Sequence, residues 1–217
     1  MIKVGLIHTT MNSIAPSNAG FRRVDAAVET VNFLDESLMP PLRTAGMTRE
    51  VRRGILHMAR QAETAGCSGI MLTCSLLSPY AEQIAACVSV PLVAADRAML
   101  AYAANCAGRV GIIATVEKTG AAVERQLMEL AAEQSRPMQI TTKIARGAFE
   151  ALERGDEALH NRIVQESAHA LDGAVDLIVF AQISMARALT DNFRTAAEIV
   201  TCPETAARAL LARINGV

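Results

Sequence analysis

The segment KVGLIHT at Lys3–Thr9 returns as RVGIIAT at Arg109–Thr115, and this internal repeat decides the fold. A second pair follows at a similar spacing, with SGIMLTCS at Ser68–Ser75 and DLIVFAQI at Asp176–Ile183. Each segment is a short apolar run rich in β-branched residues, which is typical of parallel strands buried on both faces. Two copies of one unit predict a molecule of two similar halves with a cleft between them.

The rest of the chain alternates short apolar runs with longer helical patterns, which predicts an α/β fold with right-handed crossovers. The predicted strands are 3–7, 30–33, 69–73, 90–93, 109–114, 138–142 and 176–180. The predicted helices are 48–65, 79–86, 96–106, 117–134, 156–172 and 203–214. We expect a first lobe at 1–97 plus 203–217 and a second lobe at 98–202. The segment Thr9–Gly20, rich in Asn, Ser, Pro and Gly, is predicted to be an irregular ligand loop beyond the first strand.

Composition and charge exclude several classes of protein. Of the 217 residues 51% are apolar, which is enough for a sizeable core. Basic and acidic residues nearly balance, 21 against 22, so we expect neither nucleic acid nor a membrane surface as a partner. Five cysteines without a C-x-x-C pair and four scattered histidines argue against a disulfide framework or a metal site. Without a signal-peptide pattern or a long apolar run, we expect a cytoplasmic protein.

Cys74 is the residue with the clearest chemical potential. It ends a predicted apolar strand between Thr73 and Ser75, just before a helix opened by Ser78 and Pro79. The partial positive charge of a helix N-terminus favours a thiolate, which is a nucleophile or a base. The alternative is a buried structural cysteine. The other cysteines lack this setting and are expected in the core or in helices: Cys67, Cys87, Cys106 and Cys202.

His8 ends the first predicted strand, where the second copy has Ala114. Because the carboxyl ends of neighbouring parallel strands meet at one edge of a sheet, we expect that His8 can approach Cys74. A histidine with a near-neutral pKa would deprotonate the thiol or serve as an acid or base itself. A hydrogen-bonded core histidine is the structural alternative. The other histidines lie in helical patterns and are expected to face solvent or neighbouring packing: His57, His160 and His169.

Three stretches of the chain resemble the aspartate/glutamate/hydantoin racemase superfamily. They are GCSGIMLTCSLLSP, PLVAADRAMLAYA followed by GRVGIIATVEKTGAAVERQL, and GAVDLIVFAQISMA, and the resemblance extends over nearly the whole chain. It implies two flavodoxin-like α/β lobes with parallel sheets, related by a pseudo-two-fold, with the active site in the cleft between them. It also implies one catalytic cysteine from each lobe, no cofactor, a small carboxylate substrate and a homo-oligomer.

The chain departs from the family pattern at Gln182. Cys74 matches the first catalytic cysteine of the family, and Gln182 stands at the place of the second. An amide does not ionise near pH 7, so Gln182 cannot be a second base, and racemisation by two thiols is not expected. Gln182 either donates its NH₂ to a substrate carboxylate or enolate, or it caps the following turn. Cis–trans isomerisation through a thioether, malonate decarboxylation and lyase chemistry are the branches of the family that use one cysteine.

The resemblance also implies that hydroxyl, amide and backbone N–H groups bind the substrate carboxylate. The matching candidates are Asn12, Ser13, Ser75, Thr115, Thr119 and Ser184. Thr115 and Thr119 flank the start of a predicted helix, where unpaired N–H groups form a natural anion site, unless these threonines only cap the helix. The polar cluster 35–37 follows the second strand and is expected to consist of solvated loop or cap residues.

These observations predict a cofactor-independent enzyme that acts on a small carboxylic or dicarboxylic acid through Cys74. The expected reaction is isomerisation or another conversion that needs one thiol. Three alternatives stay open: a family member that binds a carboxylate without turnover, a decarboxylase or lyase, and a racemase that uses His8 or a water-linked group as its second base.

Overall fold

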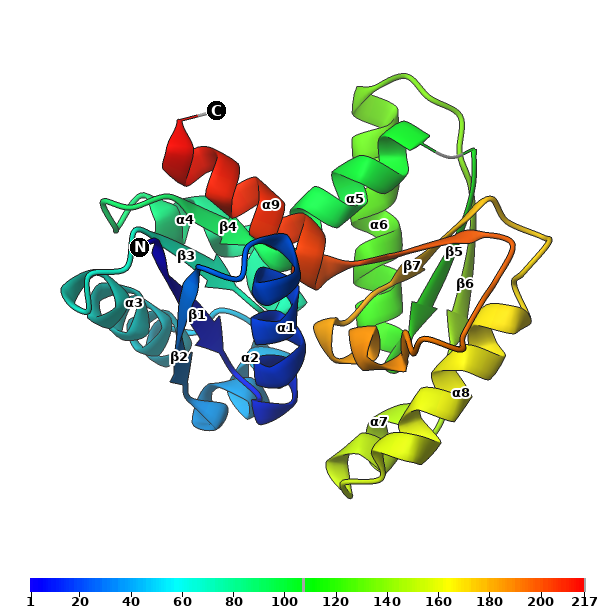
Figure 1. Ribbon diagram of the computed structural model, residues 1–217, viewed down its shortest axis with the longest axis horizontal. Helices are drawn as coiled ribbons and strands as arrows, with labels where there is room; N and C mark the ends of the chain where they lie inside the picture. Colours follow the sequence, from blue (N-terminus) through cyan, green and yellow to red (C-terminus); the bar gives the residue numbers. More distant parts are fainter. Residues whose placement is uncertain (107, 217) are drawn as a thin grey trace. The chain divides into compact units, whose positions relative to one another are not determined.

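The computed structural model describes residues 1–106 and 108–216, and it divides into two compact units. Unit 1 comprises Met1–Arg97 and Pro203–Val217, and unit 2 comprises Ala98–Cys202. Each unit contains a four-stranded parallel sheet with helices on its faces (Figure 1). The α/β class with parallel sheets, which the sequence predicts, is confirmed.

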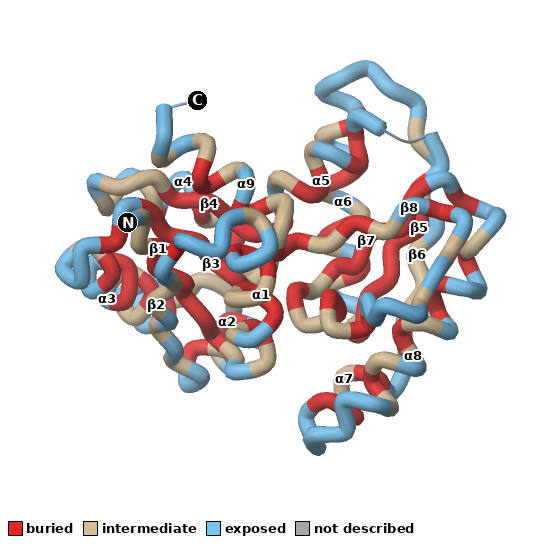
Figure 2. Tube along the Cα trace, in the orientation of Figure 1, coloured by how far each residue is buried: buried red, intermediate tan, exposed pale blue. Residues whose placement is uncertain are grey.

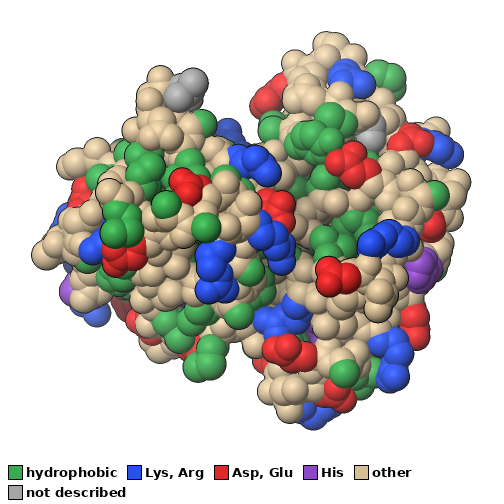
Figure 3. Space-filling view, viewed as in Figure 1, with side chains coloured by type: hydrophobic (Ala, Val, Ile, Leu, Met, Phe, Trp, Pro, Cys, Tyr) green, Lys and Arg blue, Asp and Glu red, His purple; other side chains and the backbone are tan. Residues whose placement is uncertain are grey.

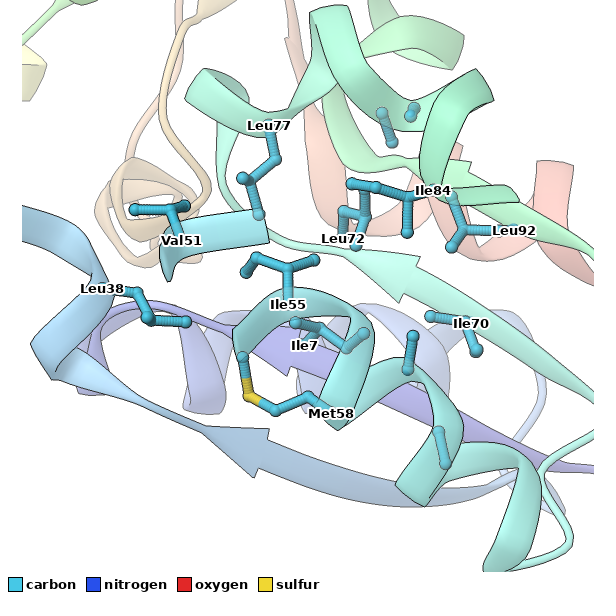
Figure 4. Close-up of a cluster of buried hydrophobic side chains, with 14 of the residues drawn as sticks. Ile7, Leu38, Val51, Ile55, Met58, Ile70, Leu72, Leu77, Ile84 and Leu92 are labelled. Carbon is cyan, nitrogen blue, oxygen red and sulfur yellow. The ribbon is translucent and has the colours of Figure 1, made fainter. Parts of the chain in front are cut away.

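The sheet of unit 1 has the strand order β2-β1-β3-β4. Its strands are β1 (Lys3–His8), β2 (Glu29–Leu34), β3 (Gly69–Leu72) and β4 (Leu92–Ala94). On one face a hydrophobic core joins the sheet to α2 (Met39–Ala45), α3 (Arg49–Thr64) and α4 (Ala81–Ala85) (Figure 4). The other face is covered by α1 (Ile14–Val24) and α9 (Cys202–Asn215).

The sheet of unit 2 has the strand order β6-β5-β7-β8. Its strands are β5 (Arg109–Ala114), β6 (Gln139–Ile144), β7 (Leu177–Phe180) and β8 (Glu198–Thr201). One face packs against α7 (Ala148–Glu153) and α8 (Glu157–His169), and α6 (Glu117–Glu133) covers the other. Helix α5 (Ala95–Cys106) follows β4 directly. A short 3-10 helix follows each of the strands β1, β2, β3 and β7. These helices are, in the same order, η1 (Met11–Ser13), η2 (Glu36–Leu38), η3 (Ser75–Tyr80) and η4 (Ile183–Ala188).

The two sheets share their strand order and their register. In unit 1 Leu72 pairs with Ile7 on one side and with Ala94 on the other. In unit 2 Phe180 pairs with Ile113 and Thr201 in the same way. The repeated sequence segments therefore form the two central strands of each sheet, which are buried along most of their length (Figure 2).

Helix α3 shows how local sequence sets an element of this fold. The Thr48 hydroxyl accepts the Val51 N–H at 3.3 Å, and Gly66, with φ of +77°, follows the helix in the left-handed region. Apolar side chains at helical spacing form the buried stripe that packs on β1 and β3, as Figure 4 shows for Val51, Ile55 and Met58. The predicted helix 48–65 is confirmed.

The prediction that Thr9–Gly20 is an irregular loop is wrong. This segment forms η1 and the first half of α1. Pro16 lies in the first turn of α1, where its missing N–H has no helical acceptor, so it does not prevent the helix. A Cβ at Gly20 would meet the Pro203 Cβ at 2.5 Å, so glycine serves the close packing of α1 on α9.

The other departures are short or weakly patterned elements. The sequence does not predict α2, α7 or the edge strand β8. The predicted helix 79–86 is a 3-10 helix, η3, that continues into the five residues of α4. The remaining predicted strands and helices occur with ends displaced by up to three residues, because terminal residues depend on packing as much as on propensity.

The surface carries acidic and basic side chains in mixture, as the face in Figure 3 shows. One hollow of about 580 Å³ lies along the exposed side of α3 and is lined mainly by arginines. None of the predicted site residues lines it. Within the described ranges, no helix combines the length and the apolar character needed to cross a bilayer.

Candidate active site

The register of the unit 1 sheet aligns three polar residues beyond its carboxyl edge. Ile7, Leu72 and Ala94 lie in one paired row, and all three contribute to the core on the α3 side. Two positions further along the chain come Thr9, Cys74 and Asp96, which all lie beyond the strand ends. Cys74 directly precedes η3, and Asp96 lies in the first turn of α5. We call Thr9, Cys74 and Asp96 the unit 1 edge row.

Cys74 is half-buried and stands at the start of η3. Burial raises the pKa of the Cys74 thiol, although the Thr9 hydroxyl and the N–H groups of Leu76 and Leu77 favour the thiolate. The negative charge of Asp96 raises this pKa further. The result is opposite to the lowering expected from a helix N-terminus, because burial outweighs the donors that surround the sulfur.

Thr9 is buried, with 1% of its surface exposed, and its hydroxyl has no hydrogen-bond partner in the described part of the chain. A buried hydroxyl without a partner is costly unless a further group uses it. The group on which the Thr9 hydroxyl acts is the Cys74 sulfur. Thr9 is therefore placed to donate a hydrogen bond once the sulfur carries a negative charge.

His8 is fully buried, and its side chain belongs to a separate polar cluster. Its Nε2–H donates to Asn32 Oδ1 at 2.9 Å, so Nδ1 accepts, and the hydroxyls of Ser13 and Thr73 lie 2.7 and 3.0 Å from it. Burial lowers the pKa of His8 to about 4, which keeps the ring neutral at pH 7. Both ring nitrogens are thus engaged, and the structure brings His8 to Ser13 and Thr73 rather than to Cys74.

The other first-lobe candidates take different places. Ser13 is buried beside His8, and its hydroxyl oxygen also lies 2.8 Å from the Thr10 carbonyl, so its single proton goes either to that carbonyl or to His8. Asn12 is half-buried in η1, with its N–H 3.4 Å from the Thr10 hydroxyl. Ser75 is half-buried and is the first residue of η3, directly after Cys74. Asn12 and Ser75 follow the carboxyl ends of β1 and β3, as predicted from the sequence.

Gln182 pairs with Thr115 beyond the carboxyl edge of the unit 2 sheet. The Thr115 N–H donates to Gln182 Oε1 at 3.0 Å, and Gln182 Nε2 donates to the Thr115 hydroxyl at 2.7 Å. Gln182 is the residue before η4, and its backbone carbonyl accepts the Met185 N–H at 3.0 Å, but its side chain makes no capping hydrogen bond with this turn. By register Thr115 and Gln182 correspond to Thr9 and Cys74, and we call them the unit 2 edge row.

Thr119 and Ser184 lie in the first turns that follow this row. No side chain caps α6, so neither Thr115 nor Thr119 has the capping role that was the alternative for them. Thr119 is half-buried, and its N–H donates to the Val116 carbonyl at 3.1 Å. Ser184 is half-buried, and its carbonyl accepts from Arg187 Nε at 3.0 Å.

Sequence reasoning missed Asp96 as a site residue. Asp96 is 2% exposed, the Ser78 hydroxyl donates to its Oδ1, and Oδ2 has no partner among the described residues. Burial raises the pKa of Asp96 against the opposing effects of Ser78, of two backbone N–H groups and of Arg97. The available signal was an acidic residue directly after an apolar strand, in PLVAADRA.

The remaining polar candidates have structural roles. Asp35 accepts the Ser37 N–H at 3.0 Å as the cap of η2, which confirms the expectation of cap residues in this cluster, and Glu36 accepts the Met11 N–H at 2.9 Å. His160 is buried, and its Nδ1–H donates to the Ala148 carbonyl at 2.9 Å. Cys67 and Cys202 are buried, Cys87 is half-buried and Cys106 is exposed; all four cysteines are free.

Comparison with solved structures supports the fold. The chain matches an aspartate racemase homologue from Pyrococcus horikoshii OT3 with a TM-score of 0.72 and 14% identity, over 99% of this chain and 100% of that one. It matches allantoin racemase from Klebsiella pneumoniae with a TM-score of 0.73 and 16% identity, over 99% and 88%. A mutant of arylmalonate decarboxylase associated with sulfate ion matches with a TM-score of 0.63 and 16% identity, over 99% and 94%.

At these identities the solved structures establish the fold alone. A search of curated proteins finds no match. The family model described as Asp/Glu/Hydantoin racemase matches residues 17–210, which is most of the chain and includes both Cys74 and Gln182. The chain therefore belongs to the Asp/Glu/hydantoin racemase family.

Proposed function

We propose that this protein is a cofactor-independent enzyme that isomerises a small carboxylic or dicarboxylic acid with Cys74 as its nucleophile. The observation that carries the proposal is the unequal pair of edge rows, in which a thiol stands in unit 1 and a neutral amide in unit 2. Racemisation through two bases requires a second group that exchanges a proton, and Gln182 has none to exchange near pH 7. Reversible addition of one thiolate has no such requirement.

The proposed reaction begins when the Cys74 thiolate adds to the carbon β to a carboxylate in an activated C=C bond. The C–S bond forms, and the π electrons move to the α-carbon and its carboxylate as an enolate. Rotation about the resulting single bond follows. The electron pair then rebuilds the double bond and expels the thiolate, so no net proton or redox equivalent is needed.

Two groups support the charged states in this scheme. The Thr9 hydroxyl favours the sulfur anion, since it lowers the pKa of the Cys74 thiol and has no hydrogen-bond partner among the described residues. Gln182 Nε2 carries two hydrogens, of which Thr115 accepts one, and the other donates to a substrate carboxylate in this proposal. The hydroxyl and amide groups at Asn12, Ser75, Thr119 and Ser184 are the proposed further contacts to substrate.

The test is incubation of the protein in deuterated buffer with maleate derivatives, malonates, hydroxy acids and amino acids, followed by NMR. Isomerisation of an unsaturated acid without deuterium at its carbons supports addition of the thiolate. Deuterium at an α-carbon with inversion indicates racemisation, and loss of CO₂ indicates decarboxylation; either would replace the proposed reaction.

Cys74→Ser is the decisive variant for this proposal. Because an alcohol is far less ionised than a thiol, we expect turnover to fall by about 10³-fold or more with the fold retained. Cys87→Ser, at a half-buried cysteine outside the edge row, is the matched control and should keep wild-type turnover. Near-normal turnover in Cys74→Ser would remove this residue from the mechanism.

A second candidate function is binding of a carboxylate without turnover. The specific observation in its favour is the raised pKa of the Cys74 thiol, which leaves little thiolate at neutral pH. Substrate-panel members that shift protein resonances but are never converted would establish this function instead.

A further inference from the structure

We infer that Asp96 is the proton acceptor of Cys74, so that the two side chains hold one negative charge between them. The inference rests on the proposed function, because it states how the nucleophilic sulfur of that function is generated. In this role Asp96 affects the substrate only through the Cys74 sulfur and does not contact the substrate itself, so it is a positioning residue.

The register of the sheet places the two groups together. Leu72 pairs with Ala94, so Cys74 and Asp96 stand at the same step beyond adjacent parallel strands. The Ser78 hydroxyl binds Asp96 Oδ1, which ties the carboxyl group to η3, the 3-10 helix that begins immediately after Cys74. The charge of Asp96 acts on the Cys74 sulfur.

The carboxyl group has an unused oxygen at this place. Oδ2 has no hydrogen-bond partner in the part of the chain that the structure describes, and Asp96 is 98% buried. A buried carboxylate oxygen without a donor is destabilised by desolvation, and a proton on it relieves this cost. Oδ2 is therefore the atom at which Asp96 would take a proton.

Few other charged groups act on Asp96. The Arg97 guanidinium favours the carboxylate, but Arg97 Nη1 also lies 3.1 Å from Glu82 Oε1, and both side chains of that ion pair are largely exposed. Solvent and Glu82 thus weaken the influence of Arg97. Neutral donors, the Ser78 hydroxyl and the N–H groups of residues 96 and 97, supply the rest of the stabilisation.

The transfer requires a side-chain rotation that brings the Cys74 thiol to Oδ2, which has no donor among the described residues. It is balanced within the pair. The S–H bond of Cys74 breaks, an O–H bond forms at Asp96 Oδ2, and the negative charge moves from the carboxylate to the sulfur. The Thr9 hydroxyl then donates to the thiolate. Burial raises the pKa of both groups, which keeps a second negative charge out of the site.

The test is the pH profile of iodoacetamide labelling at Cys74, read by mass spectrometry of the Cys74 peptide, in wild type and Asp96→Asn. Removal of the like charge lowers the pKa of the thiol, so labelling below that pKa becomes about tenfold faster. Turnover of a substrate found in the panel falls in the same variant, because the proton acceptor is gone. Faster labelling with slower turnover is not expected from mere loss of structure.

Two further measurements keep the inference testable if Asp96→Asn does not fold. Ser78→Ala removes a donor to the carboxylate, so it should shift the labelling profile in the same direction by less. In wild type, the ¹³C carboxyl resonance of Asp96 should titrate above the usual Asp range of about 3.9 and show a second inflection where Cys74 ionises. Asp191→Asn, at an exposed position of unit 2, is the control and should change neither.

A labelling profile of Asp96→Asn that superimposes on wild type, or an Asp96 resonance with one inflection near 3.9, overturns the inference. These readouts need no substrate. If they show coupling while no compound in the panel is converted, the proposed function fails and the pairing of Cys74 with Asp96 stands.

Discussion

The two edge rows share a backbone and differ in chemistry. In unit 1 the register leads to Thr9, Cys74 and Asp96, of which two can ionise. In unit 2 the same steps beyond β5 and β7 lead to Thr115 and Gln182, which are neutral and satisfy each other with two hydrogen bonds. The Thr9 hydroxyl and one Asp96 oxygen, by contrast, are buried without partners among the described residues.

This difference shows that a repeated fold conserves geometry and leaves reactivity to single side chains. A closed pair of neutral groups stabilises its sheet edge, whereas an open row of unpaired donors and acceptors costs stability and is typical of sites that bind or react. The same contrast extends to the preceding position, where unit 1 has the buried His8 and unit 2 has Ala114.

The largest expected effect comes from the position before the edge rows, His8 in unit 1, and is a loss of stability in acid. His8 has a pKa of about 4 when folded and about 6.5 when unfolded, so the unfolded chain binds the extra proton. The contribution of His8 to the free energy of unfolding is fully present above pH 6.5. It falls as the pH drops toward 4, by a total on the order of 3 kcal/mol. Urea unfolding of wild type and His8→Gln across this range measures the difference.

In His8→Gln this part of the pH dependence should disappear. His160, in unit 2, is also buried with a lowered pKa, but it is present in both proteins and cancels in the comparison. If the two proteins lose stability in parallel between pH 6.5 and pH 4, His8 is not neutral in the folded state.

A smaller difference is expected between two matched glycines, Gly5 and Gly111, which are the third residues of the repeated strands β1 and β5. An added Cβ would lie 2.7 Å from the Ala62 Cβ at Gly5 and 2.9 Å from the Leu171 Cδ1 at Gly111. Alanine cannot move its Cβ without shifting α3, whereas the end of a leucine side chain can rotate away. Gly5→Ala should therefore lower the free energy of unfolding by about 1–3 kcal/mol, and Gly111→Ala by less.

Thermal and urea unfolding of both variants measure this order. Equal losses, or a larger loss at Gly111, would contradict the expectation that the packing of Gly5 on α3 has less room for a methyl group than the packing of Gly111 on Leu171.

The smallest expected effect comes from opening the unit 2 edge row. Gln182→Ala removes both hydrogen bonds to Thr115 and leaves the buried Thr115 N–H without its acceptor, which costs about 1–2 kcal/mol. If Gln182 also donates to substrate, KM should rise with little change in kcat. Thr119→Ala, which keeps the Thr115–Gln182 pair, is the control for stability. A Gln182→Ala protein as stable as wild type would show that water replaces the amide.

The repeat and the alternation of strands with helices could be predicted because apolar runs and helical periods are local patterns, and the family could be predicted from three stretches that resemble it. The helix at Ile14–Val24 could not, because Asn, Pro and Gly suggest a loop, whereas a buried face and the contact of Gly20 with Pro203 stabilise the helix. Cys74 was identified from its place at a strand end. Asp96 was missed because its significance depends on the register between β3 and β4 and on its burial, which the sequence does not show.

The sequence by itself determined that two similar α/β units share this chain and that one cysteine has no counterpart in the second. Only the tertiary structure decided which groups act on that cysteine. His8, the last residue of β1, binds Ser13 and Thr73, whereas Thr9, one residue later, is one of the groups that act on the sulfur. The reason is physical: neighbouring residues of a strand point to opposite faces, so partners depend on register and burial rather than on closeness in the chain.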